Sequence, residues 1–294
     1  MDTAEISPGE ATARRILSEL SSVVVAFSGG VDSSVVLALA VSELGPQLVR
    51  AATACSETYP AAELRVARAV AESLGVRHVE LPTQELAIAG FAANPPERCY
   101  YCKGELFASL WQVARREGMT AVVDGGNLDD LGDFRPGLRA GDEAGVRHPL
   151  IEAGLGKNDV RAIARRLGLS NWDRPAMACL SSRFPYGEAI TAEKLAMVEA
   201  AEAWLREAGV EPVRVRHHEV GEAALARIEV GPGDIVRLAD VAERGRLVEA
   251  FQGFGYTYIT LDLAGFRSGS LNEVLSAGRS TAEKGSVDRG GVRA

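Results

Sequence analysis

The chain has 294 residues, of which 47% are hydrophobic and 24% charged, and its formal net charge is -8 at pH 7. A chain of this length can bury one large core and a second, smaller one. The acidic balance excludes a broad electrostatic footprint for nucleic acid, so an anionic ligand needs a local pocket. No apolar run approaches the ~20 residues that span a bilayer, and the N-terminal stretch lacks the layout of a signal peptide. We therefore expect a cytoplasmic protein with reduced cysteines.

The first part of the chain alternates short apolar runs with amphipathic stretches. The runs predict strands over residues 23–28, 48–56, 76–81 and 121–124. The amphipathic stretches predict helices that begin near Asp32, Pro60, Lys103 and Lys157. Apolar strands that alternate with helices are typical of a parallel sheet covered on both faces. We therefore predict an α/β fold for this part.

The pattern changes after Gly187. It predicts a helix, two strands, a helical stretch and a last strand over residues 191–207, 213–218, 226–230, 234–251 and 256–263. This order predicts a second, smaller α+β domain. We accordingly divide the chain into a nucleotide-binding domain (1–187), a domain for substrate binding and oligomerisation (188–277) and a disordered tail (278–294) that lacks apolar anchors.

A glycine- and serine-rich loop joins the first predicted strand to the first predicted helix. Its residues are Ser28, Gly29, Gly30, Val31, Asp32, Ser33 and Ser34. The glycines allow a sharp turn and close approach of a ligand, while the helix N-terminus and the hydroxyls supply donors for phosphate. Lysine is absent, which separates the loop from the Walker type, and the G-x-G-x-x-G order is absent too. The plain alternative is a capped, glycine-rich turn.

The loop SGGVDSS resembles that of the N-type ATP pyrophosphatases, or PP-loop enzymes. The resemblance implies that the chain binds ATP, that Asp32 helps to hold Mg²⁺, and that the adenine lies near Ser56 at the end of the second strand. The fourth strand ends in a turn with Gly126 and Asn127, followed by Asp129 and Asp130. Polar residues at the carboxyl ends of parallel strands face the binding crevice of such folds.

Three of the four cysteines occur in suggestive places. Cys99 and Cys102 form a C-x-x-C pair that we place directly before the third helix, and Cys179 lies in the irregular segment PAMACLSSRFPYG. A C-x-x-C pair alone could be a redox pair, half of a zinc site or a coincidence. With Cys179 as a third thiolate, the set could hold a [4Fe-4S] cluster with one open iron.

Most of the chain resembles one group of PP-loop enzymes, the LarE-type sulfur transferases. The matching stretches are SGGVDSS, ERCYYCK, DGGNLDDLGDFRPG, PAMACLSSRFPYG, RVRHHE, ARIEV and FRSGSLNE. The resemblance implies a two-domain subunit, often a homohexamer, that converts a pyridinium dicarboxylic mononucleotide to its bisthiocarboxylic form with ATP. That product would be passed to a nickel-inserting enzyme and serve the nickel-pincer cofactor of lactate racemase.

The same resemblance makes Cys179 the catalytic residue. Some members of the group sacrifice a single cysteine, which becomes dehydroalanine, and others carry three cysteines that hold a cluster. This chain has the three-cysteine set of Cys99, Cys102 and Cys179. We therefore favour sulfur carried by a cluster over a sacrificial Cys179.

The substrate's carboxylates and phosphate require local cations. Arg214 and Arg216 lie two apart on a predicted strand, so their guanidinium groups face the same side and suit bidentate anion binding. Arg183, in the Cys179 segment, could steady an anionic substrate and favour the thiolate. Glu229 is a candidate metal-binding or positioning carboxylate, as is Glu202 on the long helix, and both could equally be surface charges.

Two rival functions remain open. A PP-loop tRNA thiolase could carry the same cysteines, although the acidic charge and the lack of an RNA-binding module disfavour it. A non-catalytic nucleotide sensor would bind ATP without releasing pyrophosphate.

Overall fold

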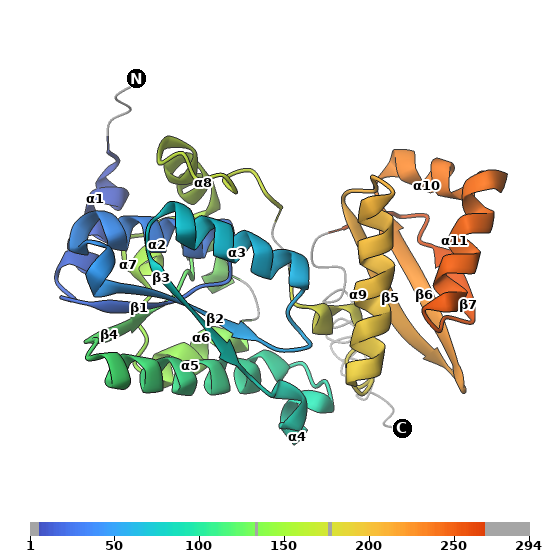
Figure 1. The fold of residues 1–294 in the computed structure, drawn as a ribbon, viewed down its shortest axis with the longest axis horizontal. Helices are drawn as coiled ribbons and strands as arrows, with labels where there is room; N and C mark the ends of the chain where they lie inside the picture. The colour runs from blue at the N-terminus through green and yellow to red at the C-terminus, as the bar shows by residue number, and fades with distance from the viewer. Residues whose placement is uncertain (1–5, 133–134, 176–177, 268–294) are drawn as a thin grey trace, which may run out of the picture. The chain divides into compact units, whose positions relative to one another are not determined.

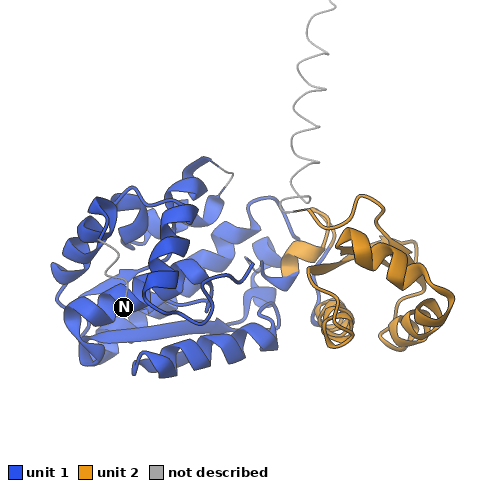
Figure 2. Cartoon of the chain, turned by 90° about the horizontal axis from the view of Figure 1, so that it is seen from above, with its two compact units in different colours: residues 1–180, 189–192 blue, residues 181–188, 193–294 orange. Residues whose placement is uncertain are grey.

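The computed structural model describes residues 6–132, 135–175 and 178–267. They form two compact units, which Figure 2 shows in different colours. The first unit contains the described residues up to Leu180 and the short stretch Ala189–Ala192, and the second contains Ser181–Glu188 and the described residues from Glu193 onward. The chain thus leaves the first unit directly after Leu180, shortly before the predicted boundary at Gly187.

The first unit is built on a four-stranded parallel sheet with the strand order β3-β2-β1-β4 (Figure 1). Its strands are β1 (Val23–Ala26), β2 (Val49–Cys55), β3 (Arg77–Pro82) and β4 (Ala121–Val123). β1 and β4 are buried along their whole length. Such continuous apolar runs belong to a parallel sheet that is covered on both faces.

Helices cover both faces of this sheet (Figure 1). Val23 and Val25 face one layer, while Val24 and Ala26 face the other, because successive side chains of a strand point to opposite sides. The first layer contains α1 (Pro8–Ser18), α2 (Val31–Leu44), α3 (Ala61–Ser73) and α8 (Lys157–Arg166), and the second contains α5 (Arg98–Glu117) and α6 (Pro136–Glu143). Two short helices, α4 (Ala89–Ala92) and α7 (Pro149–Glu152), complete the unit. The predicted α/β class is confirmed.

The second unit has its own sheet and its own core. Its strands are β5 (Val213–Val220), β6 (Ala223–Val230) and β7 (Tyr258–Leu261), and its helices are α9 (Ala192–Glu207), α10 (Pro232–Ala239) and α11 (Val241–Gly253). β5 and β6 form an antiparallel hairpin, and β7 runs parallel to β6. The helices pack on the sheet face that carries Val215, Ala226 and Ile228. Arg214 and Arg216 therefore lie on the opposite face of β5.

Besides α4, α6 and α7, which the sequence patterns did not predict, three elements differ from the sequence-based expectation. The helical stretch 234–251 is two helices, because Asp240 ends α10 in extended backbone and its side chain then accepts a bond from Ala242 N (3.0 Å) to start α11. Helix α1 was not predicted, although Ser7 caps it by accepting a bond from Glu10 N (3.2 Å). The S-x-x-E pattern is a known helix-start signal.

The third difference concerns the cysteine pair. Cys99 and Cys102 do not precede the helix but are the second and fifth residues of α5, which begins at Arg98. Residues three apart in a helix lie on the same face, so the two thiols are neighbours. No helix of the described residues is long and apolar enough to cross a membrane. The predicted tail 278–294 lies outside the described residues.

Candidate active site

The loop between β1 and α2 is held by bonds between serine hydroxyls and the backbone. Ser33 Oγ donates to Gly30 O (3.1 Å) and accepts from Ser28 N (3.2 Å). Gly29 has φ +66°, and a Cβ at this position would lie 3.0 Å from the backbone of Ala67 on α3. Gly30 is the N-cap of α2 and has no side chain to occupy the first-turn N–H groups. These groups are therefore available to an anionic ligand.

Two residues that sequence reasoning missed brace this loop. Asn171 is buried, and its Nδ2 donates to Gly29 O (2.8 Å) and to Ser34 Oγ (2.8 Å). Tyr59 Oη donates to Ser28 O (2.8 Å). Neither residue belongs to a local motif with the loop. Only the packing of distant segments reveals their part in shaping it.

The turn after β4 packs directly against the loop Ser28–Ser34, which we call the phosphate loop. A Cβ on Gly125 would lie 2.7 Å from Ser33 N, so only glycine permits this approach. The next residue, Gly126, donates its N–H to Asp124 Oδ1 (3.0 Å), which tightens the turn. Asn127 is fully buried. Its Nδ2 makes no hydrogen bond of normal geometry within the described part of the chain, but its side chain lies close enough to the Asp32 carboxyl group to lower the pKa of that group. The turn therefore meets the first turn of α2 through Asn127 as well as through Gly125.

Asp32 lies in an acidic environment at this edge of the sheet. Burial raises the pKa of its carboxyl group, and the nearby charge of Asp130 raises it further, while Lys157 and Arg161 act in the opposite direction. Asp130 also pairs with Arg135 (2.9 Å). Within the described ranges no three His, Cys, Asp or Glu side chains gather to hold a metal ion. Two carboxylates nevertheless fit Mg²⁺, which takes its remaining ligands from water and nucleotide phosphates.

The carboxyl end of β2 is in contact with the Cys179 segment. Ser56 Oγ and Thr58 Oγ1 lie 2.9 Å apart, and Thr58 O accepts a bond from Leu180 N (2.9 Å). Leu180 is buried in the first unit, so its neighbour Cys179 is held at the edge of the sheet where the phosphate loop lies. Cys55, at the end of β2, is half-buried, and burial raises the pKa of its thiol.

The three cysteines singled out by sequence lie close enough to influence one another. Burial raises the pKa of Cys102, and the nearby Cys179 raises it further. The pKa of Cys99 is raised by the same two causes, although the residue is partly open to solvent. The structure therefore brings all three into one region of the first unit. The described residues do not hold them as a ready-made group of metal ligands.

The second unit contains what we call the arginine–glutamate cluster: Arg183, Arg214, Arg216, Glu202 and Glu229. Arg183 is fully buried and forms a bidentate pair with Glu202 (2.7 and 3.0 Å). Arg216 forms a second bidentate pair with Glu229 (3.0 and 3.0 Å) and donates to Ser182 O (2.6 Å). Two predicted substrate ligands, Arg183 and Arg216, thus have internal carboxylate partners.

Arg214 is the exception in this cluster. Its guanidinium stacks over the Phe266 ring (4.7 Å) and forms no ion pair with any carboxylate of the described chain. Burial, Arg183 and Arg216 together lower its pKa to about 10. A half-buried cation among other cations favours the binding of an anion.

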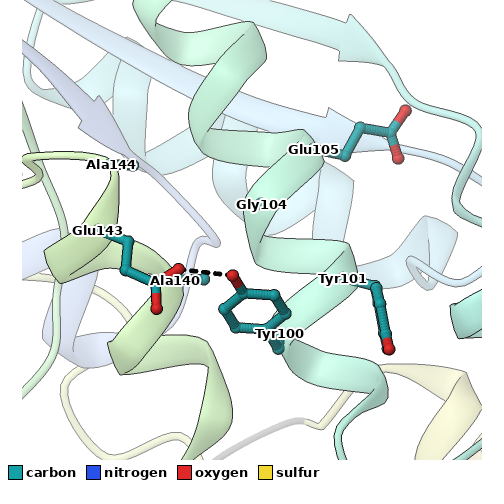
Figure 3. Close-up of a pocket in the computed structure, with 7 residues that line it drawn as sticks. All are labelled: Tyr100, Tyr101, Gly104, Glu105, Ala140, Glu143 and Ala144. Atoms are coloured by element: carbon teal, nitrogen blue, oxygen red, sulfur yellow. Dashed lines mark hydrogen bonds between the residues drawn. The ribbon is translucent and has the colours of Figure 1, made fainter.

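A shallow depression of about 360 Å³ lies between α5 and α6 (Figure 3). It is lined by Tyr100, Tyr101, Gly104, Glu105, Ala140, Glu143 and Ala144. Figure 3 shows the bond in which Tyr100 Oη donates to Glu143 Oε2 (2.5 Å). None of the predicted ATP-binding residues lines it, so the nucleotide site is defined by the strand ends and not by this depression.

Comparison with known proteins places this geometry in a family. The asparagine synthase family profile matches residues 9–109. The pyridinium-3,5-bisthiocarboxylic acid mononucleotide synthase of Lactiplantibacillus plantarum is 41% identical over 276 residues, which cover 93% of this chain and 97% of that protein. The chain belongs to the LarE-type sulfur transferases. Within this PP-loop family, an uncharacterized protein of Synechocystis is 47% identical over 90% of the chain and 96% of its own length.

A relative with another activity matches less of the LarE-type chain. The tRNA-specific 2-thiouridylase of Sphingopyxis alaskensis is 32% identical over 194 residues, which cover 52% of this chain and 49% of that protein. The predicted nucleotide ligands and the three cysteines lie together in the first unit of this LarE-type chain, and Arg183, Arg214, Arg216 and Glu229 lie together in the second. Their roles stay predictions.

Proposed function

We propose that the chain uses ATP to adenylate a carboxylate of a pyridinium dicarboxylic mononucleotide and then replaces an oxygen of that carboxylate with sulfur. The observation that carries the proposal is the contact between Leu180 and Thr58, which holds Cys179 at the edge of the sheet where the phosphate loop lies. The name of the Lactiplantibacillus relative supports the choice of substrate.

Nucleotide binding would fall to the loop Ser28–Ser34 and the turn after β4. The first-turn N–H groups of α2 and the serine hydroxyls would bind phosphate oxygens. Asp32 and Asp130 would hold Mg²⁺, which supplies neutralising charge for the pyrophosphate that leaves. The raised pKa of Asp32 supports this assignment, because a cation between two carboxylates relieves their repulsion.

The chemistry consists of two displacements. A carboxylate oxygen of the substrate attacks the α-phosphorus of ATP, the bond from that phosphorus to the bridging oxygen breaks, and pyrophosphate leaves. The carboxylate is now an acyl-adenylate, whose AMP is a good leaving group. Sulfur delivered at Cys179 then attacks the acyl carbon, and AMP leaves with the electron pair of the broken carbon–oxygen bond.

The source of that sulfur is the finer part of the proposal. Cys99, Cys102 and Cys179 would hold a [4Fe-4S] cluster, which when bound supplies an open iron that can carry an extra sulfur atom. Three thiolates are the kind and number of ligands that such a cluster needs. The pKa values of Cys99 and Cys102 are both raised by the nearby Cys179, so the three thiols are close to one another. Binding would have to draw them to ligating distance. In the sacrificial alternative Cys179 itself loses the elements of H₂S and becomes dehydroalanine.

The arginine–glutamate cluster would receive the substrate's anionic groups. Arg214 would be the main ligand of these groups, because it has no carboxylate partner among the described residues. Arg216 and Arg183 add positive charge beside it. Glu229 would orient Arg216 through their bidentate pair. A homohexamer and transfer of the product to a nickel-inserting enzyme remain further predictions from the family resemblance.

The test measures pyrophosphate release, intact mass and bound iron in one anaerobic preparation. We expect pyrophosphate release that depends on the pyridinium substrate, bound iron and sulfide, and an unchanged protein mass after turnover. Loss of the elements of H₂S without bound iron would exclude the cluster and establish the sacrificial route. Cys179→Ala should retain pyrophosphate release and yield no thiocarboxylate, whereas the matched variant Cys55→Ser should yield it.

The same assay separates the rival functions. Pyrophosphate release that requires tRNA and ignores the pyridinium substrate would establish a tRNA thiolase in place of the proposed enzyme. If the chain binds ATP but releases no pyrophosphate with either the pyridinium substrate or tRNA, the nucleotide sensor is the remaining function.

A further inference from the structure

A buried histidine that the proposed mechanism does not use lies behind the turn after β4. His148 is 8% exposed, and its Nδ1 lies 2.7 Å from Oδ1 of Asp124, which is 7% exposed. The same Oδ1 accepts the bond from Gly126 N (3.0 Å). One carboxylate oxygen therefore joins the imidazole to the backbone of the turn.

The fold makes room for this imidazole at a specific place. A Cβ on Gly141 of α6 would lie 2.9 Å from His148 Cε1 and 3.3 Å from the ring of Phe107 on α5. Any larger residue at position 141 would occupy the space of the imidazole. His148 N also donates to Glu152 Oε1 (2.9 Å), so the backbone of the histidine is held as well as its ring.

The charges around the pair favour an ionic bond. Burial alone would raise the pKa of Asp124, but the bond to His148 brings it below its usual value. Burial alone would lower the pKa of His148, but Asp124, Asp142 and Glu152 raise it. A charged hydrogen bond of this kind is stronger than a neutral one and fixes the position of both partners.

The turn that this pair holds belongs to the nucleotide site. Gly125 lies against the backbone of Ser33, and the Asn127 side chain lies close enough to the Asp32 carboxyl group to lower its pKa. A shift at Asp124 would therefore reach both the phosphate loop and the Asn127 donor.

We propose that His148 is a positioning residue for nucleotide binding: its imidazole holds Asp124, and Asp124 holds the Gly125–Asn127 turn against the phosphate loop. This inference rests on the proposed use of the loop for ATP. His148 touches no substrate itself and acts through Asp124.

The test compares two substitutions at position 148 with a control. His148→Asn places an amide N–H where Nδ1 lies and keeps the bond to Asp124, whereas His148→Leu removes it. His78→Leu is the matched control, because it removes a bond from a half-buried histidine to Thr53 (2.8 Å) on the same sheet. Thermal unfolding first establishes that each variant is fully folded at the temperature of the binding and exchange measurements.

Two readouts decide the outcome. Calorimetric titration with Mg·ATP should show about tenfold weaker binding for His148→Leu, because a hydrogen bond to a charged group is lost. Binding should stay near the wild-type value for His148→Asn and His78→Leu. Hydrogen exchange at the Gly126 amide should speed up in His148→Leu alone.

Unchanged binding and unchanged Gly126 exchange in His148→Leu would overturn the inference. Should His148→Leu fail to fold, Gly141→Ala replaces it, since the added methyl displaces the imidazole from Asp124 without replacing either His148 or Asp124. The exchange readout does not depend on catalysis. It therefore decides the inference even if substrate-dependent pyrophosphate release, and with it the proposed function, fails.

Discussion

The phosphate loop of the first unit and the arginine–glutamate cluster of the second handle charge in opposite ways. The loop is built from glycines, hydroxyls and backbone groups, with Asp32 and Asp130 beside it. The cluster contains full charges, and two of its arginines are already paired with Glu202 and Glu229. The loop thus depends on close packing of backbone, and the cluster on charge balance. Small steric changes should damage the first, and removal of one charge the second.

The largest expected effect is in the cluster. Glu202→Ala should destabilise the second unit by about 3–5 kcal/mol, because it leaves the buried Arg183 without its carboxylate. Glu202 also accepts bonds from Arg206 and from Val215 N (3.1 Å), which would be lost as well. Urea unfolding followed by Trp204 fluorescence, with Trp111 and Trp172 replaced by Phe, measures the change in this unit.

The control for this prediction is the ion pair between Arg246 and Glu243 in α11 of the same unit, with exposed side-chain fractions of 67% and 29%. Glu243→Ala should cost less than about 1 kcal/mol. Equal costs for the two substitutions would show that the cluster does not depend on charge balance.

A steric change should harm the phosphate loop next. Gly125→Ala places a Cβ 2.7 Å from Ser33 N and 2.9 Å from Ser33 Cα, and both are backbone atoms that cannot turn aside. We expect substrate-dependent pyrophosphate release to fall by about 100-fold, the cost of a displacement near 1 Å in a catalytic site. Gly104→Ala is the control, because nothing lies within 4 Å of its Cβ. Wild-type rates in Gly125→Ala would contradict the close-packing account.

Acid should weaken the second unit through His217. Its imidazole packs against the rings of Phe184 and Tyr256, with ring centroids 5.3 and 5.6 Å away, and burial lowers its pKa to about 4. Between pH 6.5 and pH 4 the unfolded histidine binds a proton that the folded one does not, so stability falls as the pH falls. The expected loss is about 2 kcal/mol between pH 7 and pH 5.

The measurement is urea unfolding at both pH values, again followed by Trp204. His217→Phe keeps the ring packing and removes the titration, so its stability should change less over this range. A variant with the same pH dependence as the wild type would assign the effect to other groups.

The smallest expected effect is on the brace of the phosphate loop. Asn171→Ala leaves Gly29 O and Ser34 Oγ without the Nδ2 donor, and we expect the KM for ATP to rise about tenfold. The exposed Asn158 on α8 is the matched control, and Asn158→Ala should leave KM unchanged. An unchanged KM in Asn171→Ala would mean that the loop keeps its shape without the brace.

The sequence by itself determined the features that depend on neighbouring residues. Apolar runs and glycine–serine turns predicted the α/β class, the phosphate loop and the family, because strand, turn and helix signals are local. The same reasoning misplaced the start of α5. The helix begins at Arg98, and the residues around this position carry no distinct N-cap signal.

Only the tertiary structure decided which distant side chains meet. Asn171 lies 142 residues from Gly29, and His148 lies 24 residues from Asp124, yet both contacts shape the nucleotide site. The pairing of Arg183 with Glu202 was likewise absent from any motif, and it gives an arginine predicted to bind substrate an internal partner. Buried polar groups must find partners wherever the packed chain brings them together, and spacing along the sequence does not record that choice.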